Sequence, residues 1–199
     1  MKIAHLTTHT SGGAGSLAYN IFKVSIKRKD QTNILISTET VRFNFILLIY
    51  LSFLNRLYDL VYSILGLFKL VDEKHLFFGL FPSFPFKKKF EKETSNVDFF
   101  FIYWISRFYD SCDLRKLKIK NPKARFIFFN TDEAPLTGGC HYKFACKNHE
   151  NSCVECPAVN SHLIKKKILK EFQNKVNTYS DLKPKFILPS SKYFLKFQN

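Results

Sequence analysis

The chain has 199 residues, of which 46% are hydrophobic, and it carries a formal net charge of +15 at pH 7. This apolar fraction excludes an intrinsically disordered protein, and the length allows one core and a medium-sized domain. The positive charge favours anionic partners such as an acidic membrane leaflet, phosphorylated substrates or nucleic acid. Nucleic acid is the least favoured, because no zinc-finger, homeodomain or RNA-recognition pattern accompanies the lysines.

The N-terminal residues predict a strand, a glycine-rich turn, a helix and a second strand. The strands are Lys2–Thr7 and Thr32–Ser37, and the turn is Ser11–Ser16, with the sequence SGGAGS. Between them, residues 17–29 place their apolar side chains on one helical face. This order is typical of a βαβ unit. The residues before the glycines lack the apolar run of a signal peptide, so we expect a cytoplasmic protein with reduced thiols.

The segment Phe43–Val71 is strongly apolar, but Asn55, Arg56 and Asp59 interrupt it before it is long enough to span a membrane. Polar residues recur every three or four positions and form a narrow stripe on an otherwise apolar helix. The favoured prediction is a buried helix or helical hairpin. The alternative is an interfacial helix that lies on an anionic membrane surface, on the inner face of the membrane.

The alternation of strands and helices continues after a loop rich in proline and charge at residues 77–96. The predicted elements are, in order, strand Val97–Trp104, helix 105–117, strand Ala124–Asn130, helix 160–181, strand Lys185–Ser191 and the start of a helix at 191–199. This order predicts an α/β fold that is Rossmann-like, with a mainly parallel sheet and helices on both faces.

Three segments follow predicted strands, where parallel sheets bind their ligands. Gly12 and Gly13 leave backbone N–H groups beside a helix N-terminus, which suits a phosphate, a carboxylate or a sugar. They form neither a dinucleotide fingerprint nor a P-loop, and a tight turn explains them equally well. The segment YWIS follows a middle strand. Asp132 and Glu133 follow the next strand, where carboxylates can accept hydrogen bonds from sugar hydroxyls or act as a base; turn capping is the alternative.

Four of the five cysteines lie in the loop 138–157, with the spacing C-x5-C-x6-C-x2-C. They are Cys140, Cys146, Cys153 and Cys156. Four thiolates can close a tetrahedral structural zinc site, which would order a loop with little core of its own, and His141 or His149 can replace a thiol. Two disulfides or four free thiols are the alternatives; a reducing compartment disfavours the first and the clustering disfavours the second. Cys112 stands apart and is predicted to lie in the core.

Several of these segments together resemble family-4 glycosyltransferases of the two-Rossmann-domain, GT-B type. Residues 1–30 resemble the opening of that family, YWISRFYD at 103–110 its middle strand end, and FILPSSKYFLKF at 186–197 the end of its N-terminal domain. The segment 132–159, DEAPLTGGCHYKFACKNHENSCVECPAV, resembles a loop found in a polysaccharide-building branch. Tyr103 and Thr131 stand where that family commonly has histidine.

The resemblance implies a retaining transferase that moves a sugar from a nucleotide-sugar donor to a glycan or lipid-linked acceptor in cell-surface polysaccharide synthesis. Residues 1–199 would be its N-terminal, acceptor-side domain. The donor domain, with its paired-glutamate motif, is expected in a missing part of a truncated or split gene, or in a separate chain. The chain alone is therefore expected to be an incomplete enzyme.

The same resemblance implies an acceptor groove, and we infer from the cysteines that a zinc ion lies beside it. Its residues are Gly12, Gly13, Tyr103, Trp104, Thr131, Gly138 and Gly139, with Asp132 as the catalytic candidate. A structural zinc ion at the four cysteines would shape this groove without taking part in the reaction. The alternative function is a non-catalytic, zinc-stabilised module that binds an anionic membrane surface or a partner transferase.

Overall fold

The structure is a computed structural model that describes residues 1–40, 45–77, 80, 83 and 87–188. The chain divides into two compact units, a division that the sequence did not predict. The first, called the sheet unit, comprises Met1–Val41, Ser83–Thr131 and Val176–Asn199. The second, called the cysteine unit, comprises Arg42–Pro82 and Asp132–Lys175. Each is described by itself.

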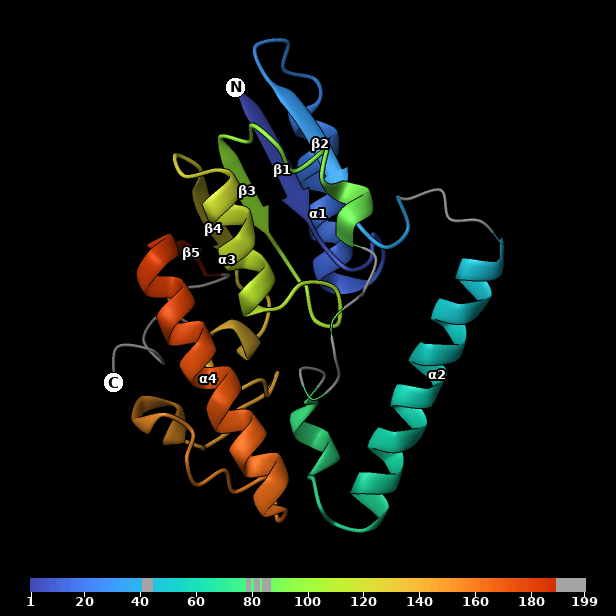
Figure 1. Ribbon diagram of the computed structural model, residues 1–199, viewed down its shortest axis with the longest axis vertical. Coiled ribbons are helices and arrows are strands. Elements are labelled where there is room, and N and C mark those ends of the chain that lie inside the picture. Colours follow the sequence, from blue (N-terminus) through green and yellow to red (C-terminus); the bar gives the residue numbers. More distant parts are fainter. Residues whose placement is uncertain (41–44, 78–79, 81–82, 84–86, 189–199) are drawn as a thin grey trace. The chain divides into compact units, whose positions relative to one another are not determined.

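The sheet unit is built on five parallel strands in the order β2-β1-β3-β4-β5 (Figure 1). Their bounds are β1 Lys2–Leu6, β2 Thr32–Ile36, β3 Phe99–Ile102, β4 Arg125–Phe129 and β5 Lys185–Ile187. The central strands are nearly continuous apolar runs, as expected where both faces of a parallel sheet are covered. The predicted α/β, Rossmann-like fold with a parallel sheet is therefore confirmed.

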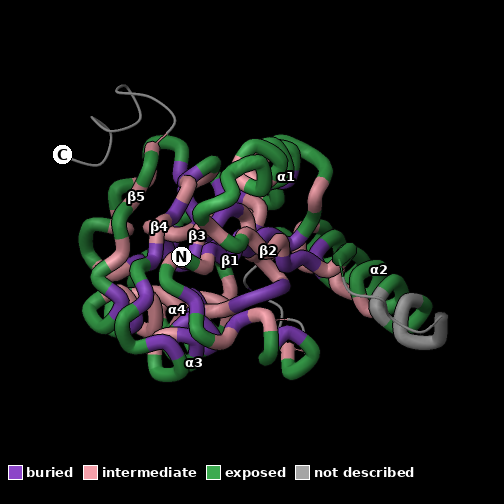
Figure 2. The backbone as a smooth tube through the Cα atoms, turned by 90° about the horizontal axis from the view of Figure 1, so that it is seen from above, coloured by how far each residue is buried: buried purple, intermediate pink, exposed green. Residues whose placement is uncertain are grey.

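Helices cover both faces of this sheet. Helix α1, Gly12–Ser25, lies on one face, where Phe22 meets the ring of His5 at 5.7 Å between centroids. Helix α3, Ser111–Lys120, and the last turns of α4, His162–Leu182, lie on the other (Figure 2). There Tyr179 meets Phe128 edge-on, at 5.4 Å between centroids. Seven apolar side chains of β1, β3 and β4 are buried in the sheet unit: Ile3, Ala4, Leu6, Phe100, Ile102, Phe126 and Phe128.

Two helices of the sheet unit begin at other residues than predicted. Helix α1 begins at Gly12, so the glycines form its first turn and do not precede it. The helix predicted over 105–117 begins only at Ser111, because Asp110 caps it. Asp110 accepts a hydrogen bond from the N–H of Asp113 at 2.9 Å, and Asp113 accepts one from the N–H of Asp110 at 3.0 Å. The helix predicted at 191–199 lies outside the described residues.

The cysteine unit contains helix α2, Phe45–Leu67, the first part of α4 and the loop that holds four cysteines. Its core joins the end of α2 to that loop and to α4. The buried residues of this core are Tyr62, Val71, Phe77, Leu80, Cys153, Cys156, Ala158, Val159 and Ile168. Two of the cysteines are thus core residues of a small unit.

The prediction that the apolar segment is a buried helix or hairpin is wrong. Helix α2 is one helix of 23 residues, and among its side chains that the structure describes, Tyr62 and Leu65 are the ones that enter the core. Much of its apolar surface is exposed, because its apolar residues cover more than one face while the core meets only one. The exposed residues are Ile49, Tyr50, Phe53, Leu57, Leu60, Val61, Ile64 and Leu67. Of the helices that the structure describes, none is both long and apolar enough to cross a membrane.

Candidate functional site

The candidate site of the sheet unit is the carboxyl edge between β1 and β3. The strand order reverses there, because β2 lies on one side of β1 while β3, β4 and β5 follow on the other. Parallel α/β sheets bind ligands in the crevice at such a point. The loops after the two strands are joined: the N–H of Thr8 donates to the carbonyl of Trp104 at 2.7 Å, and the Thr8 hydroxyl donates to the carbonyl of Ser106 at 2.9 Å.

Polar and aromatic side chains meet at this edge. The Nδ1 atom of His9 lies 3.3 Å from a carboxylate oxygen of Glu39, and the two side chains are 48% and 41% exposed. The other oxygen of Glu39 accepts from the N–H of Thr10 at 2.9 Å and from its hydroxyl. The ring of His9 stacks on the indole of Trp104, with 5.9 Å between centroids. The site therefore offers a carboxylate, an imidazole and an aromatic face together.

Glu39 is ionised at neutral pH. Partial burial would raise the pKa of its carboxyl, but hydrogen bonds from Thr10 and the nearby His9 outweigh it and lower the pKa. The sequence reasoning missed His9, Thr10 and Glu39. The available signal was the polar run THTS, residues 8–11, directly before the glycines.

Four of the predicted groove residues lie at this same edge. Gly12 and Gly13 are exposed in the first turn of α1, and a Cβ on either would have no heavy atom within 4 Å among the described residues. Trp104 follows β3, and Thr131 is exposed after β4. Beside Thr131, both polar side-chain atoms of Asn130 are buried, without a hydrogen-bond partner in the described part of the chain.

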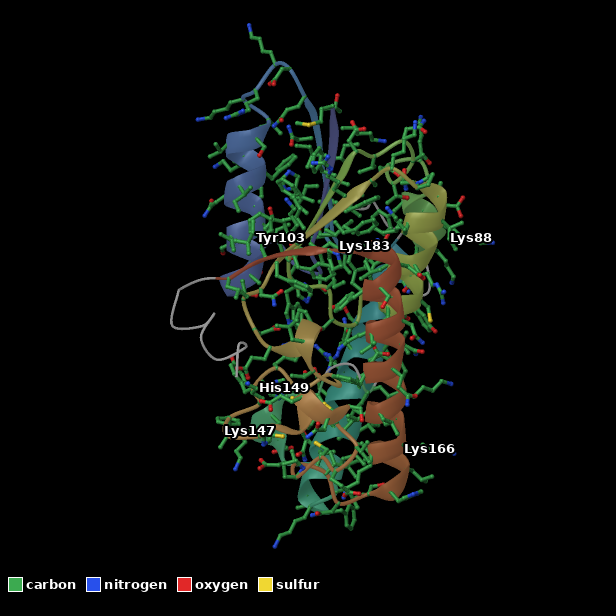
Figure 3. All side chains as sticks on the ribbon, turned by 90° about the vertical axis from the view of Figure 1, so that its left-hand side faces the viewer. Lys88, Tyr103, Lys147, His149, Lys166 and Lys183 are labelled. Atoms are coloured by element: carbon green, nitrogen blue, oxygen red, sulfur yellow. The ribbon has the colours of Figure 1, made fainter. Side chains whose placement is uncertain are left out.

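Tyr103 lies in the core beneath this edge, not on the surface (Figure 3). Its hydroxyl and the Nδ1 atom of His5 are 3.1 Å apart, and its ring stacks on Phe129 at 4.7 Å between centroids. Burial raises the pKa of Tyr103 and lowers that of His5, so both are neutral at physiological pH. The other ring nitrogen of His5 lies 3.3 Å from the amide oxygen of Asn33.

Asp132, the predicted catalytic residue, makes two contacts within the cysteine unit. One of its oxygens lies 2.6 Å from Nδ1 of the buried His141, and the other accepts from the N–H of Ala134 at 3.0 Å. Asp132 therefore makes a local hydrogen bond to the first residue of the short 3₁₀ turn Ala134–Leu136, close to the turn-capping alternative, although the cap position itself is Glu133. It also orients an imidazole. The sequence did not reveal this Asp–His pair, because the two residues meet only through the folding of the loop.

Gly138 and Gly139 are buried and shape the loop. A Cβ on Gly138 would overlap Ile168 of α4, and Gly139 has a φ of +126°, which favours glycine. The N–H of Gly138 donates to Sγ of Cys153 at 3.3 Å. Both predicted substrate-binding glycines therefore have packing roles within the cysteine unit. The predicted groove would take residues from both units, and it stays a prediction.

The four loop cysteines line one cavity of about 20 Å³, together with Lys143 and His149. In Figure 3 sulfur atoms lie near the labelled His149. All five cysteines are free thiols. Burial raises the pKa of Cys140 and Cys153 to about 11, and it also raises that of Cys156. Neighbouring cysteines of the loop raise the pKa of each of these three thiols further.

Two predictions about the cysteines have different outcomes. Within the described residues, no three or more His, Cys, Asp or Glu side chains are already arranged to hold a metal ion. The zinc site therefore stays a prediction. The prediction that Cys112 is a core residue is wrong, because Cys112 is exposed on α3. Its neighbours Ser111 and Asp113 face the protein instead.

Comparison of the chain with protein-family models, with curated proteins and with solved structures finds no match.

Proposed function

We propose that this chain is the acceptor-binding portion of a retaining GT-B type glycosyltransferase that builds cell-surface polysaccharide. It would position a glycan or lipid-linked acceptor for attack on a nucleotide-sugar. The observation that carries the proposal is the group of exposed His9 and Glu39 and half-buried Trp104, at the point where the strand order of the sheet reverses. The ordered resemblance of four segments to that family supports it independently.

A sugar matches the chemistry of this edge. Its hydroxyls can donate to the ionised carboxylate of Glu39, and the apolar face of its ring can pack on the indole of Trp104. If the acceptor carries a phosphate, as lipid-linked sugars do, the exposed first turn of α1 at Gly12 and Gly13 favours its negative charge. Thr131 offers a further hydroxyl.

The rest of the reaction would be shared between Asp132 and a donor-binding domain. Asp132 would act by holding the buried His141 in one tautomer. The nucleotide-sugar would be bound by a second Rossmann-like domain, in a further segment or a separate chain. Activity is therefore to be sought in the complete assembly, and acceptor binding in these 199 residues.

The test is to fill the groove at Gly13. Gly13 is exposed and a Cβ on it would have no heavy atom within 4 Å among the described residues, so Gly13→Trp should leave the fold intact. Calorimetric titration with polyprenyl diphosphate sugars and free oligosaccharides should show binding that Gly13→Trp weakens by about tenfold, or about 1.4 kcal/mol. The matched control is Val24→Trp, a 65% exposed position later in α1, which should bind normally. Unchanged binding by Gly13→Trp would refute the groove, and no binding by the wild-type chain would refute the acceptor role.

A second candidate function is a non-catalytic module that lies on an anionic membrane surface. The exposed apolar residues of α2 favour it, because an apolar helix face inserts into the interface while the charge of +15 attracts acidic lipids. Phe53 and Leu60 of α2 are 62% and 58% exposed.

Sedimentation with vesicles tests this second candidate. The wild type should bind vesicles that contain phosphatidylglycerol, and added salt should weaken the binding. The double variant Phe53→Gln, Leu60→Gln should lose it, whereas Val24→Gln, an exposed apolar position of α1, should not. Binding that ignores lipid charge and the α2 substitutions would rule the candidate out.

A further inference from the structure

The cavity of the cysteine unit gathers groups that the proposed acceptor site does not use. Four cysteines from separate points of one loop line it. The remaining cysteine, Cys112, is exposed on a helix of the other unit. The loop contains only short 3₁₀ turns, so its backbone is not fixed by long helices or strands.

Backbone donors point at two of the sulfur atoms. The N–H of Gly138 donates to Sγ of Cys153 at 3.3 Å, and the N–H of Ala158 makes a hydrogen bond to the side chain of Cys156. Such bonds stabilise sulfur that carries negative charge and orient it, as outer-shell partners of metal ligands do.

Two lysine side chains bring positive charge to the same place. Lys143 is 7% exposed and lines the cavity. The ammonium of Lys175 donates to the carbonyls of Ala134 and Thr137, at 2.8 and 3.0 Å. Burial lowers the pKa of Lys175, and the nearby Glu171, Cys140, Cys153 and Asp132 oppose this by favouring its charged form. A divalent ion with four thiolates has a net charge of about −2, which two ammonium groups would balance.

The histidines of the loop are engaged elsewhere. His149 lines the cavity, but its Nε2 atom lies 3.1 Å from the ammonium of Lys143 and accepts its hydrogen bond. His141 does not line the cavity, and its Nδ1 atom lies 2.6 Å from a carboxylate oxygen of Asp132. Sulfur is therefore the donor that the cavity offers to a metal, and soft thiolate sets suit zinc.

We propose that this cavity binds one Zn²⁺ through Cys140, Cys146, Cys153 and Cys156, with Lys143 and Lys175 balancing its charge. Four S–H bonds break and four Zn–S bonds form, so four protons leave and no electrons move. The cavity of about 20 Å³ has room for a single small sphere. Because the thiols do not yet form a ligand set, binding would draw them inward and tighten the loop. The proposal is independent of the acceptor site.

The first test is metal analysis and cobalt substitution of the whole chain, purified under reducing conditions. We expect one zinc per chain. Cobalt should give the sulfur-to-cobalt charge-transfer band and the intense visible bands of tetrahedral thiolate coordination. His149→Gln should leave this spectrum unchanged, because its imidazole is not a ligand. The wild-type spectrum keeps the test valid even if cysteine variants fail to fold.

Variants supply the second test. Cys156→Ser should lose stoichiometric zinc, while Cys112→Ser, the matched control outside the cavity, should keep it. Lys143→Met and Lys175→Met should weaken zinc binding by about 10- to 100-fold, the effect typical of outer-shell partners.

Three results would overturn the proposal. The first is wild-type protein that holds no zinc and gives no cobalt band. The second is a mass lower by four hydrogens, which would identify two disulfides. The third is a spectrum that changes in His149→Gln, which would show a mixed ligand set. Acceptor binding by Gly13→Trp and its control is unaffected by any of these, so the two proposals fail separately.

Discussion

Gly15 has a different role from the glycines that precede it in α1. A Cβ on Gly15 would lie 2.5 Å from the carbonyl oxygen of His9, whereas one on Gly13 meets open space. Gly15→Ala should therefore push the loop after β1 aside and lower the free energy of unfolding by about 1–3 kcal/mol. Gly13→Ala should raise it by about 0.4–1 kcal/mol, through the unfolded chain. Urea unfolding measures both, and equal effects would contradict the close contact at Gly15.

Acid should destabilise the sheet unit through His5. Burial lowers the pKa of this imidazole in the folded protein, so the unfolded chain takes up the proton first as pH falls. The free energy of unfolding should be level above about pH 6.5 and fall below it, by up to about 1.4 kcal/mol per pH unit for this group.

Variants separate this imidazole from the others. His5→Gln should flatten the acid slope of the unfolding free energy measured in urea between pH 7 and pH 5. His149, whose pKa is also lowered mainly by burial, supplies the comparison through His149→Gln. An acid slope that survives in His5→Gln and disappears in His149→Gln would assign the effect to the cysteine unit.

For single residues, the sequence predicts where a residue lies in the fold better than which side chain it contacts. It places Gly12, Gly13, Trp104 and Thr131 after strands, and the sheet brings them to one edge because parallel strands share their direction. It does not reveal the pairing of His9 with Glu39, since 30 residues separate them and only the register of β1 and β2 joins them.

Among the helices, α3 depends most visibly on its first residue. Asp110→Ala removes the capping box and the hydrogen bond from Ser83 at 2.6 Å, so it should cost about 1–2 kcal/mol of unfolding free energy. Asp110→Asn should retain most of the cap. The control is Asp181→Ala, which breaks an exposed ion pair with Arg115 and should change stability by less than about 1 kcal/mol. Thermal unfolding followed by circular dichroism ranks the stabilities of the three variants. Similar losses of stability in Asp110→Ala and Asp181→Ala would show that the cap does not stabilise α3.

The strands were predictable because each is an apolar run in a sheet that is covered on both faces. Helix starts were harder. Glycine is unfavourable inside a helix, so the sequence predicts a loop where the first turn of α1 begins. The burial of α2 could not be predicted, because a helix that is apolar on several faces gives no sign of which face meets the core.

For the whole molecule, the charge of +15 should make stability depend on salt. Self-repulsion destabilises the compact state, and screening relieves it. Exposed ion pairs such as Arg115 with Asp181 stabilise the fold only slightly, so salt that screens them removes little stability. The urea midpoint should therefore rise as sodium chloride goes from about 50 mM to about 500 mM. Lys29→Glu with Lys123→Glu, at two exposed positions, should reduce this rise; a midpoint that falls with salt in the wild type would contradict the expectation.

Because β1 pairs with two strands, it cannot complete its pairing during synthesis until β3 has been made. Lys2 meets Thr32 of β2 soon after both are made, but Ile3 meets Phe99 of β3 only much later. At the usual pace of translation, β1 waits about 5–20 s for this partner. One edge of a buried, apolar strand stays open during that interval, which is when a chaperone would be needed. Slow synthesis of the segment between them would lengthen this exposure.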